Sequence, residues 1–155
     1  MPYKVVVPVI DYSVRNLCTR SYPNHLKGCP NYDKKVGCPP QCKRIDKVLN
    51  LGEPIYIIWN VFRLADHVAR MKVLHPFWTW RQLTCCLYWQ PKARKQLEQE
   101  IRDFNLEHSL LYKIILRVPE ARGVNVTETM KKIGEYLEWP PKTKTYQVAL
   151  IGQKR

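Results

Sequence analysis

The sequence has no apolar run long enough to cross a bilayer. Its longest one, Ile55–Trp59, has the length of a strand, whereas a membrane helix needs about 20 apolar residues. The N-terminal segment Met1–Val7 lacks the longer apolar core and the small-residue cleavage site of a secretory signal peptide. We therefore expect a cytoplasmic location, where thiols stay reduced.

Common catalytic motifs are missing as well. The sequence contains no phosphate-binding P-loop, no GxGxxG, no GxSxG and no HExxH. The histidines show no metal-ligand spacing among themselves, and His67 is expected to be solvated on the polar side of its helix. None of these absences decides between an enzyme and a non-catalytic protein.

Acidic residues are scarce relative to basic ones. The chain has 13 acidic and 26 basic residues, a formal net charge of +13. Such an excess favours a polyanionic partner, with nucleic acid first. Metal-bound thiolates compensate part of the charge, and the rest predicts RNA of a tRNA-like kind. The competing interpretation is a scattered, solvated charge. The predicted RNA contacts are Arg15, Arg20, Lys27, Lys34, Lys35, Lys43 and Arg44, joined by Lys92, Arg94 and Lys95 on a later helix.

Cysteine is the residue type that the sequence concentrates in one place. Four of its six cysteines follow the pattern Cys18-x10-Cys29-x8-Cys38-x3-Cys42, and glycine or proline flanks two of them. Thiolates bind zinc and iron–sulfur clusters. Structural zinc uses close cysteine pairs, whereas these wide, unequal gaps favour a larger [4Fe–4S] cluster over zinc. Four ordinary buried thiols are the remaining alternative, and His25 is either a ligand or solvated.

Two patches of the chain resemble a family of uncharacterised predicted metal-binding proteins. One patch joins Arg15-x2-Cys18, Gly28-Cys29-Pro30-Asn31-Tyr32 and Cys38-Pro39-Pro40, and the other runs over residues 119–126, with Thr129 and Gly134 beyond. The resemblance implies metal ligation by Cys18, Cys29 and Cys38. That family usually carries a second, CxxC-type segment, where this chain has only Cys85-Cys86. We expect these two cysteines to be buried free thiols.

The number of cysteine ligands separates two functions. Three ligands leave one iron open for sulfur or redox chemistry on RNA or a nucleobase. Cys42 is the expected fourth ligand beside Cys18, Cys29 and Cys38. Four ligands close the cluster and favour a non-catalytic metalloprotein, either an electron carrier or a metal-stapled interaction module.

The hydrophobic pattern predicts a single α/β or α+β domain over residues 1–155. We expect a single layer of helices on a small mixed sheet, with a cysteine-rich metal-binding loop over residues 11–46. Asn60 is expected to cap a helix that ends near His75, and Asn125 another whose apolar stripe reaches Leu137. Glu98 is expected to pair with Arg102.

A further helix is expected with Pro91 in its first turn and an apolar face at Leu97, Ile101 and Phe104. Strands are expected over residues 4–10, 54–59 and 145–151. Residues 110–116 are expected to form either a strand or a helix. Residues 77–89 are aromatic and ambiguous. Their tryptophans and tyrosine surround Arg81, and a core role is favoured over stacking on bases.

Overall fold

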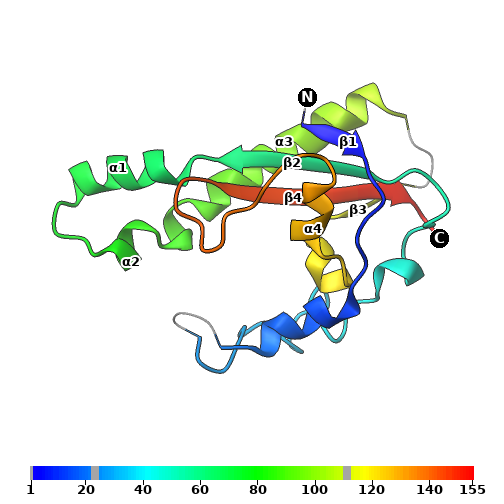
Figure 1. Cartoon of the computed structure of the whole chain (residues 1–155), viewed down its shortest axis with the longest axis horizontal. Helices are drawn as coiled ribbons and strands as arrows, with labels where there is room; N and C mark the ends of the chain where they lie inside the picture. Colours follow the sequence, from blue (N-terminus) through cyan, green and yellow to red (C-terminus); the bar gives the residue numbers. More distant parts are fainter. Residues whose placement is uncertain (1, 22–24, 110–112) are drawn as a thin grey trace.

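A four-stranded antiparallel sheet forms the centre of the computed structural model, which describes residues 2–21, 25–109 and 113–155 (Figure 1). Its strands, in spatial order, are β1 (Tyr3–Val5), β2 (Tyr56–Phe62), β4 (Thr145–Gln153) and β3 (Lys113–Leu116). The α+β class is confirmed, but the expected mixed sheet is wrong. β4 inserts between β2 and β3, so that every pair of neighbouring strands runs antiparallel.

One face of the sheet packs against a long helix, α3 (Gln90–Glu107), which runs along it in Figure 1. Proline stands in its first turn, as the sequence predicts, because proline has no N–H to donate there. Alternate strand residues point toward α3, in keeping with the period of two along a strand. The buried cluster between them is formed by Ile58, Ala149 and Ile151 of the sheet and by Leu97, Ile101 and Phe104 of the helix.

The opposite face of the sheet is covered too, so the expected single layer of helices is wrong. It packs against two short 3-10 helices, η2 (Ile45–Lys47) and η4 (Pro119–Arg122), and against α4 (Val126–Lys131). The Asn125 side chain caps α4 by accepting the Glu128 N–H at 3.1 Å, as expected. The helix nevertheless ends at Lys131, well before Leu137.

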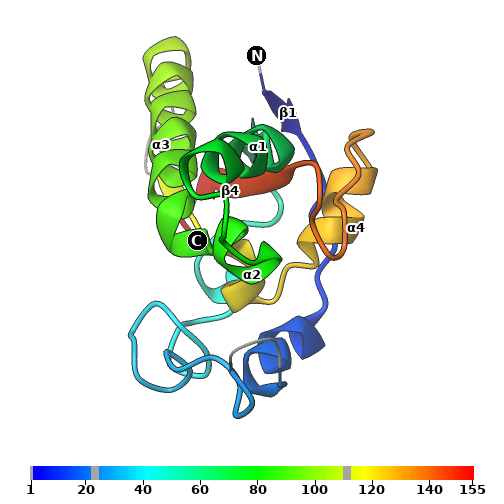
Figure 2. The same ribbon diagram turned by 90° about the vertical axis from the view of Figure 1, so that its left-hand side faces the viewer.

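An arm of helices, α1 (Leu64–Leu74) and α2 (Trp80–Leu83), extends from the end of β2 (Figures 1 and 2). The prediction that Asn60 caps α1 is wrong. β2 continues through Asn60 because this residue pairs with Gln147 of β4, and the helix starts only at Leu64. The predicted end near His75 is confirmed. No helix within the described ranges is long and apolar enough to span a membrane.

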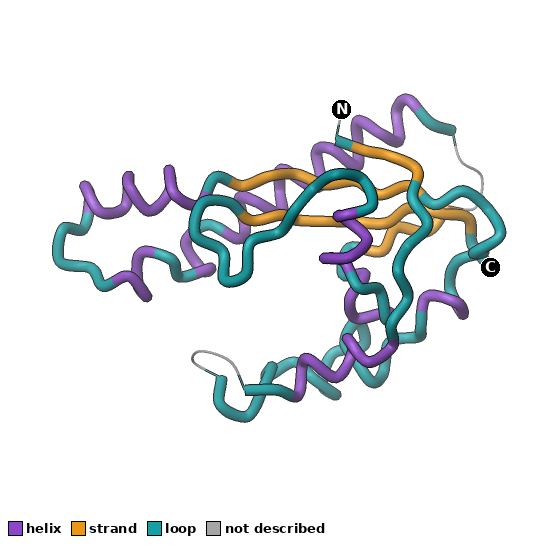
Figure 3. The backbone as a smooth tube through the Cα atoms, in the orientation of Figure 1, coloured by secondary structure: helices purple, strands orange, loops and turns teal. Residues whose placement is uncertain are grey.

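The segment between β1 and β2 is mostly turns and loops, as Figure 3 shows, with the 3-10 helix η1 (Tyr12–Thr19) at its start. β1 is shorter than the expected strand. The chain is tied to η4 where the Asp11 N–H donates to the Gly123 carbonyl at 2.8 Å. Gly123 has φ +94° and leaves no space for a Cβ beside the Tyr12 ring. Glycine at this point therefore lets η1 pack closely against η4.

The final strand is confirmed as β4, and β3 accounts for the end of the undecided 110–116 segment. The beginning of that segment, residues 110–112, lies outside the described residues.

Candidate metal centre

The four clustered cysteines form two pairs joined through the backbone. The Cys29 N–H donates to the Cys18 carbonyl at 2.7 Å, and the Cys42 N–H donates to the Cys38 carbonyl at 3.0 Å. Gly28 makes the first pair feasible because its left-handed backbone, φ +87°, lies directly against Cys18. The segment between the pairs is closed by the Asp33 N–H, which donates to the Pro39 carbonyl at 2.8 Å.

The two pairs share one electrostatic environment. Burial raises the pKa of the Cys18 thiol first, and the nearby Cys29, Cys38 and Cys42 raise it further. A neighbouring thiolate disfavours a second negative charge, so Cys29, Cys38 and Cys42 each lie close enough to act on the Cys18 thiol despite their separation in sequence. A bound cation would remove that penalty and favour the thiolate forms.

Cys42 differs from the other three cysteines. It is only 4% exposed, whereas Cys18, Cys29 and Cys38 are all half-buried. Its thiol donates to the Ala121 carbonyl at 3.0 Å. Arg15 clamps the same point, because its guanidinium donates to the Cys42 carbonyl at 2.6 Å and to the Ala121 carbonyl at 3.1 Å. Cys42 therefore fastens the loop to η4.

An open hollow of about 550 Å³ lies beside the first cysteine pair. Cys18 and Cys29 line it together with His25, and Lys27 and Lys34 contribute positive charge to its wall. Thiols and an imidazole are donors that suit zinc or an iron–sulfur cluster. The donor types thus fit a thiophilic centre, although nowhere in residues 2–21, 25–109 and 113–155 are three His, Cys, Asp or Glu side chains arranged to hold one metal ion.

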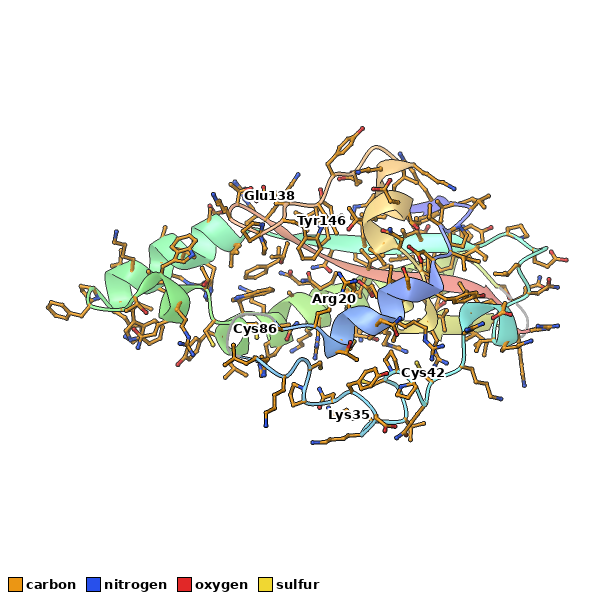
Figure 4. All side chains as sticks on the ribbon, turned by 60° about the horizontal axis from the view of Figure 1, so that its bottom comes forward. Arg20, Lys35, Cys42, Cys86, Glu138 and Tyr146 are labelled. Carbon is orange, nitrogen blue, oxygen red and sulfur yellow. The ribbon has the colours of Figure 1, made fainter. Side chains whose placement is uncertain are left out.

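Three predicted RNA contacts, Lys92, Arg94 and Lys95, are exposed on α3. The seven in the loop divide into two groups. Arg15 is engaged with backbone carbonyls, and the Arg44 guanidinium lies 4.3 Å from the centroid of the Tyr12 ring. The other five are exposed, and Figure 4 shows Lys35 pointing outward from the loop. These exposed residues, called the loop cations below, are Arg20, Lys27, Lys34, Lys35 and Lys43.

Two expectations about side chains outside the loop are wrong. Cys86 is exposed, because it lies in the short turn η3 (Cys86–Tyr88) between α2 and α3. His67 is 4% exposed rather than solvated. Because α1 begins at Leu64, His67 joins the buried stripe of Leu64 and Val68 at i+3 and i+4. The sequence would predict this buried stripe, His67 included, if the start of α1 at Leu64 were known.

The aromatic segment before α3 is partly core. Trp89 is buried and stacks on Phe62 at 5.2 Å between ring centroids, while Trp80 and Tyr88 remain exposed.

Comparisons of this chain with protein-family models, with curated proteins and with solved structures find no match.

Proposed function

We propose that this chain holds one iron–sulfur cluster through Cys18, Cys29 and Cys38. The observation that carries the proposal is that the half-buried Cys18 and Cys29 line one open hollow, and that Cys38 lies close enough to act electrostatically on Cys18. The resemblance of the cysteine motifs to a family of predicted metal-binding proteins supports the same ligand set. The wide spacing of the cysteines favours a cluster over a single zinc ion, which uses closer pairs.

The arrangement around Cys42 supports three ligands rather than four. Its thiol already donates to the Ala121 carbonyl, and Arg15 holds its backbone in place. Recruiting Cys42 would break that buried hydrogen bond, whose net contribution is about 0.5–1.5 kcal/mol, while the Ala121 carbonyl would still accept from Arg15. A three-cysteine site leaves one iron without a protein thiolate, and such an iron can act as a Lewis acid or carry sulfur.

The substrate class that fits this site is RNA or a nucleobase, modified by sulfur or redox chemistry. The loop cations surround the cysteines along the chain and are free of ion pairs within the described ranges. Phosphate backbones are the polyanions that such cations bind most commonly. This proposal makes the protein an enzyme or a sulfur carrier.

A non-catalytic metalloprotein is the second candidate, and one contact favours it. The backbone hydrogen bond between Cys42 and Cys38 keeps the two residues within one turn. Movement of the Cys42 thiol away from Ala121 would allow four thiolates to close the site, as in an electron carrier or a metal-stapled interaction module.

Anaerobic purification with iron and sulfide analysis tests the cluster. We expect a brown protein with about four irons per chain. The variant Cys29→Ala should lose the cluster, and the exposed Cys86→Ala is the matched control that should keep it. A colourless protein with stoichiometric zinc would contradict the proposal.

The variant Cys42→Ala separates the two candidate functions. If three cysteines hold the cluster, iron and sulfide contents should stay near those of the native chain. If the site is closed by four thiolates, the content should fall as far as in Cys29→Ala, and the non-catalytic function would be favoured.

A further inference from the structure

A second cavity, of about 390 Å³, lies where the end of β2, the start of α1 and the start of α3 meet. None of its lining residues belongs to the cysteine-rich loop. Its polar wall is formed from two helices at helical spacing, so that side chains three or four residues apart face the same space. These polar residues are Arg63, Asp66, His67 and Arg70 near or on α1, and Lys92 and Gln96 on α3.

Positive charge is in excess in this cavity. Asp66 is the one carboxylate among the lining residues, and Arg63 neutralises it through a 3.0 Å ion pair. Arg70 and Lys92 are different, since neither side chain has an ion pair or hydrogen bond within the described part of the chain. Two uncompensated cations from different helices therefore face one space.

His67 adds a buried group without a partner. Both of its ring nitrogens are buried and lack a hydrogen bond among the residues that the structure describes. The Leu83 backbone is close enough to favour the protonated ring slightly, but no bond of normal length forms. An unpaired buried polar group is costly, so it calls for a partner from outside the chain.

The surroundings of His67 specify the charge of that partner. Burial lowers its pKa first, and the positive charges of Arg70 and Lys92 lower it further. The negatively charged Asp66 also faces the cavity but is held by Arg63. An anion placed among these groups would pair with both free cations and accept a hydrogen bond from the imidazole.

Gln96 supplies a further donor. Its Oε1 accepts from the Asn60 side chain at 3.3 Å, which leaves the amide NH₂ of Gln96 for a ligand. Arg70 can bind two oxygens of an oxyanion through its planar guanidinium, while Lys92 acts as a point charge. This set of donors, with two uncompensated charges, matches a dianionic phosphate better than a carboxylate.

We propose that this cavity binds the phosphate group of a nucleotide-sized ligand through Arg70, Lys92, His67 and Gln96. The cavity volume lies within the range of small-molecule sites, roughly 300–1,000 Å³, so there is space for more than the phosphate itself. The site is separate from the proposed metal centre and stands or falls independently of it.

Calorimetric titration of the full chain with a nucleoside 5′-monophosphate, with inorganic phosphate and with the unphosphorylated nucleoside tests the site. We expect the nucleotide and inorganic phosphate to bind and the nucleoside to bind at least tenfold more weakly than the nucleotide. Arg70→Gln and Lys92→Gln should each weaken phosphate binding about tenfold, the loss of one charge-assisted contact. Lys72→Gln, an exposed residue of α1 outside the cavity, should leave the affinity unchanged.

Nuclear magnetic resonance of the histidine side chains provides a second readout. Phosphate should shift the His67 ring signals and raise the pKa of His67, an effect that a diffuse attraction to the basic surface would not produce. The proposal is overturned if phosphate does not bind at millimolar concentration, if the nucleoside binds as well as the nucleotide, or if Lys72→Gln weakens binding as much as Arg70→Gln.

Discussion

Gly28 offers a direct test of how the loop holds its first cysteine pair. A Cβ added at this residue would lie 2.5 Å from the Cys18 carbonyl oxygen and 2.9 Å from the Thr19 carbonyl carbon. Both obstacles are backbone atoms, which cannot rotate away as a side chain does. The left-handed φ of +87° adds a penalty for any residue with a side chain. Together these effects should cost roughly 1–3 kcal/mol in the Gly28→Ala variant.

The cost should fall on the loop and not on the sheet. Gly28 touches the backbone that aligns the Cys29 N–H with the Cys18 carbonyl, and it belongs to neither of the buried clusters on the two faces of the sheet. We therefore expect Gly28→Ala to lose most of its bound metal while its urea unfolding midpoint, measured without metal, stays close to that of the native chain.

Gly37 provides a matched control within the same loop. It precedes Cys38 as Gly28 precedes Cys29, but nothing lies within 4 Å of the Cβ that alanine would add there. Iron and sulfide per chain, measured after anaerobic reconstitution, should be normal in Gly37→Ala and reduced several-fold in Gly28→Ala. Normal metal content in Gly28→Ala, or equal loss in both variants, would refute the reasoning.

Three further predictions concern stability and order. Phe104→Ala should lower the free energy of unfolding by about 3–5 kcal/mol, because Phe104 is fully buried between α3 and the sheet. Urea unfolding measures this change, and a loss below about 1 kcal/mol would contradict the packing. Because the pKa of His67 is lowered in the folded chain, the unfolded state takes up the proton first, so stability should fall as the pH drops below about 6.5. His67→Gln should flatten that pH dependence in urea unfolding between pH 8 and 5, and an unchanged slope would exclude His67 as its source. Chelation should increase hydrogen exchange within residues 11–46 and leave α3 protected; equal exchange with and without chelator would show that the loop is ordered without metal.

Local patterns predicted the elements whose packing is simple. The stripe of Leu97, Ile101 and Phe104 identified the face of α3 because one side of that helix meets one side of the sheet. The Asn125 cap was equally readable, since its hydrogen bond to Glu128 lies within one turn. These features depend on neighbours in the sequence, and the structure confirms them.

Features that depend on distant segments could not be read in this way. Asn60 has the chemistry of a helix cap, but pairing with β4 extends β2 through it, and its side chain donates to the Ala93 carbonyl of α3 at 3.2 Å. Glu98 accepts hydrogen bonds from Arg117, which lower its pKa, while Arg102, the expected partner, contributes only its nearby positive charge. In each case, a residue that is distant in the sequence forms the main contact in place of the expected neighbour.

The same limit applies to the candidate site. Cysteine spacing alone predicts that the four thiols act together, and in the fold burial and then the other three cysteines raise the pKa of the Cys18 thiol. Spacing does not reveal that Cys42 is hydrogen-bonded to Ala121 and clamped by Arg15, because Ala121 is far along the chain. The sequence therefore identifies the four cysteines as candidate ligands. Only the fold shows that Cys42 is buried and anchors the loop, whereas the other three thiols are half-buried.

The net charge of the sequence likewise overstates the number of basic side chains that are available to a partner, because some of them are engaged within the fold. Arg15 and Arg44 belong to the basic segment but are engaged within the chain, which leaves the five loop cations for the proposed RNA partner. Each neutralised phosphate contributes about −0.9 to the slope of log K against log salt for a duplex and about −0.7 for a single strand.

The loop alone should therefore give a slope no steeper than about −4 to −5 with duplex RNA. Filter binding to bulk tRNA at several salt concentrations measures this slope, and Lys34→Gln combined with Lys35→Gln should flatten it by about 2 if both residues contact phosphates. Lys142→Gln, an exposed lysine outside the loop, is the control. A slope that is unchanged in the double variant, or that flattens equally in Lys142→Gln, would mean that the loop is not the RNA-binding surface.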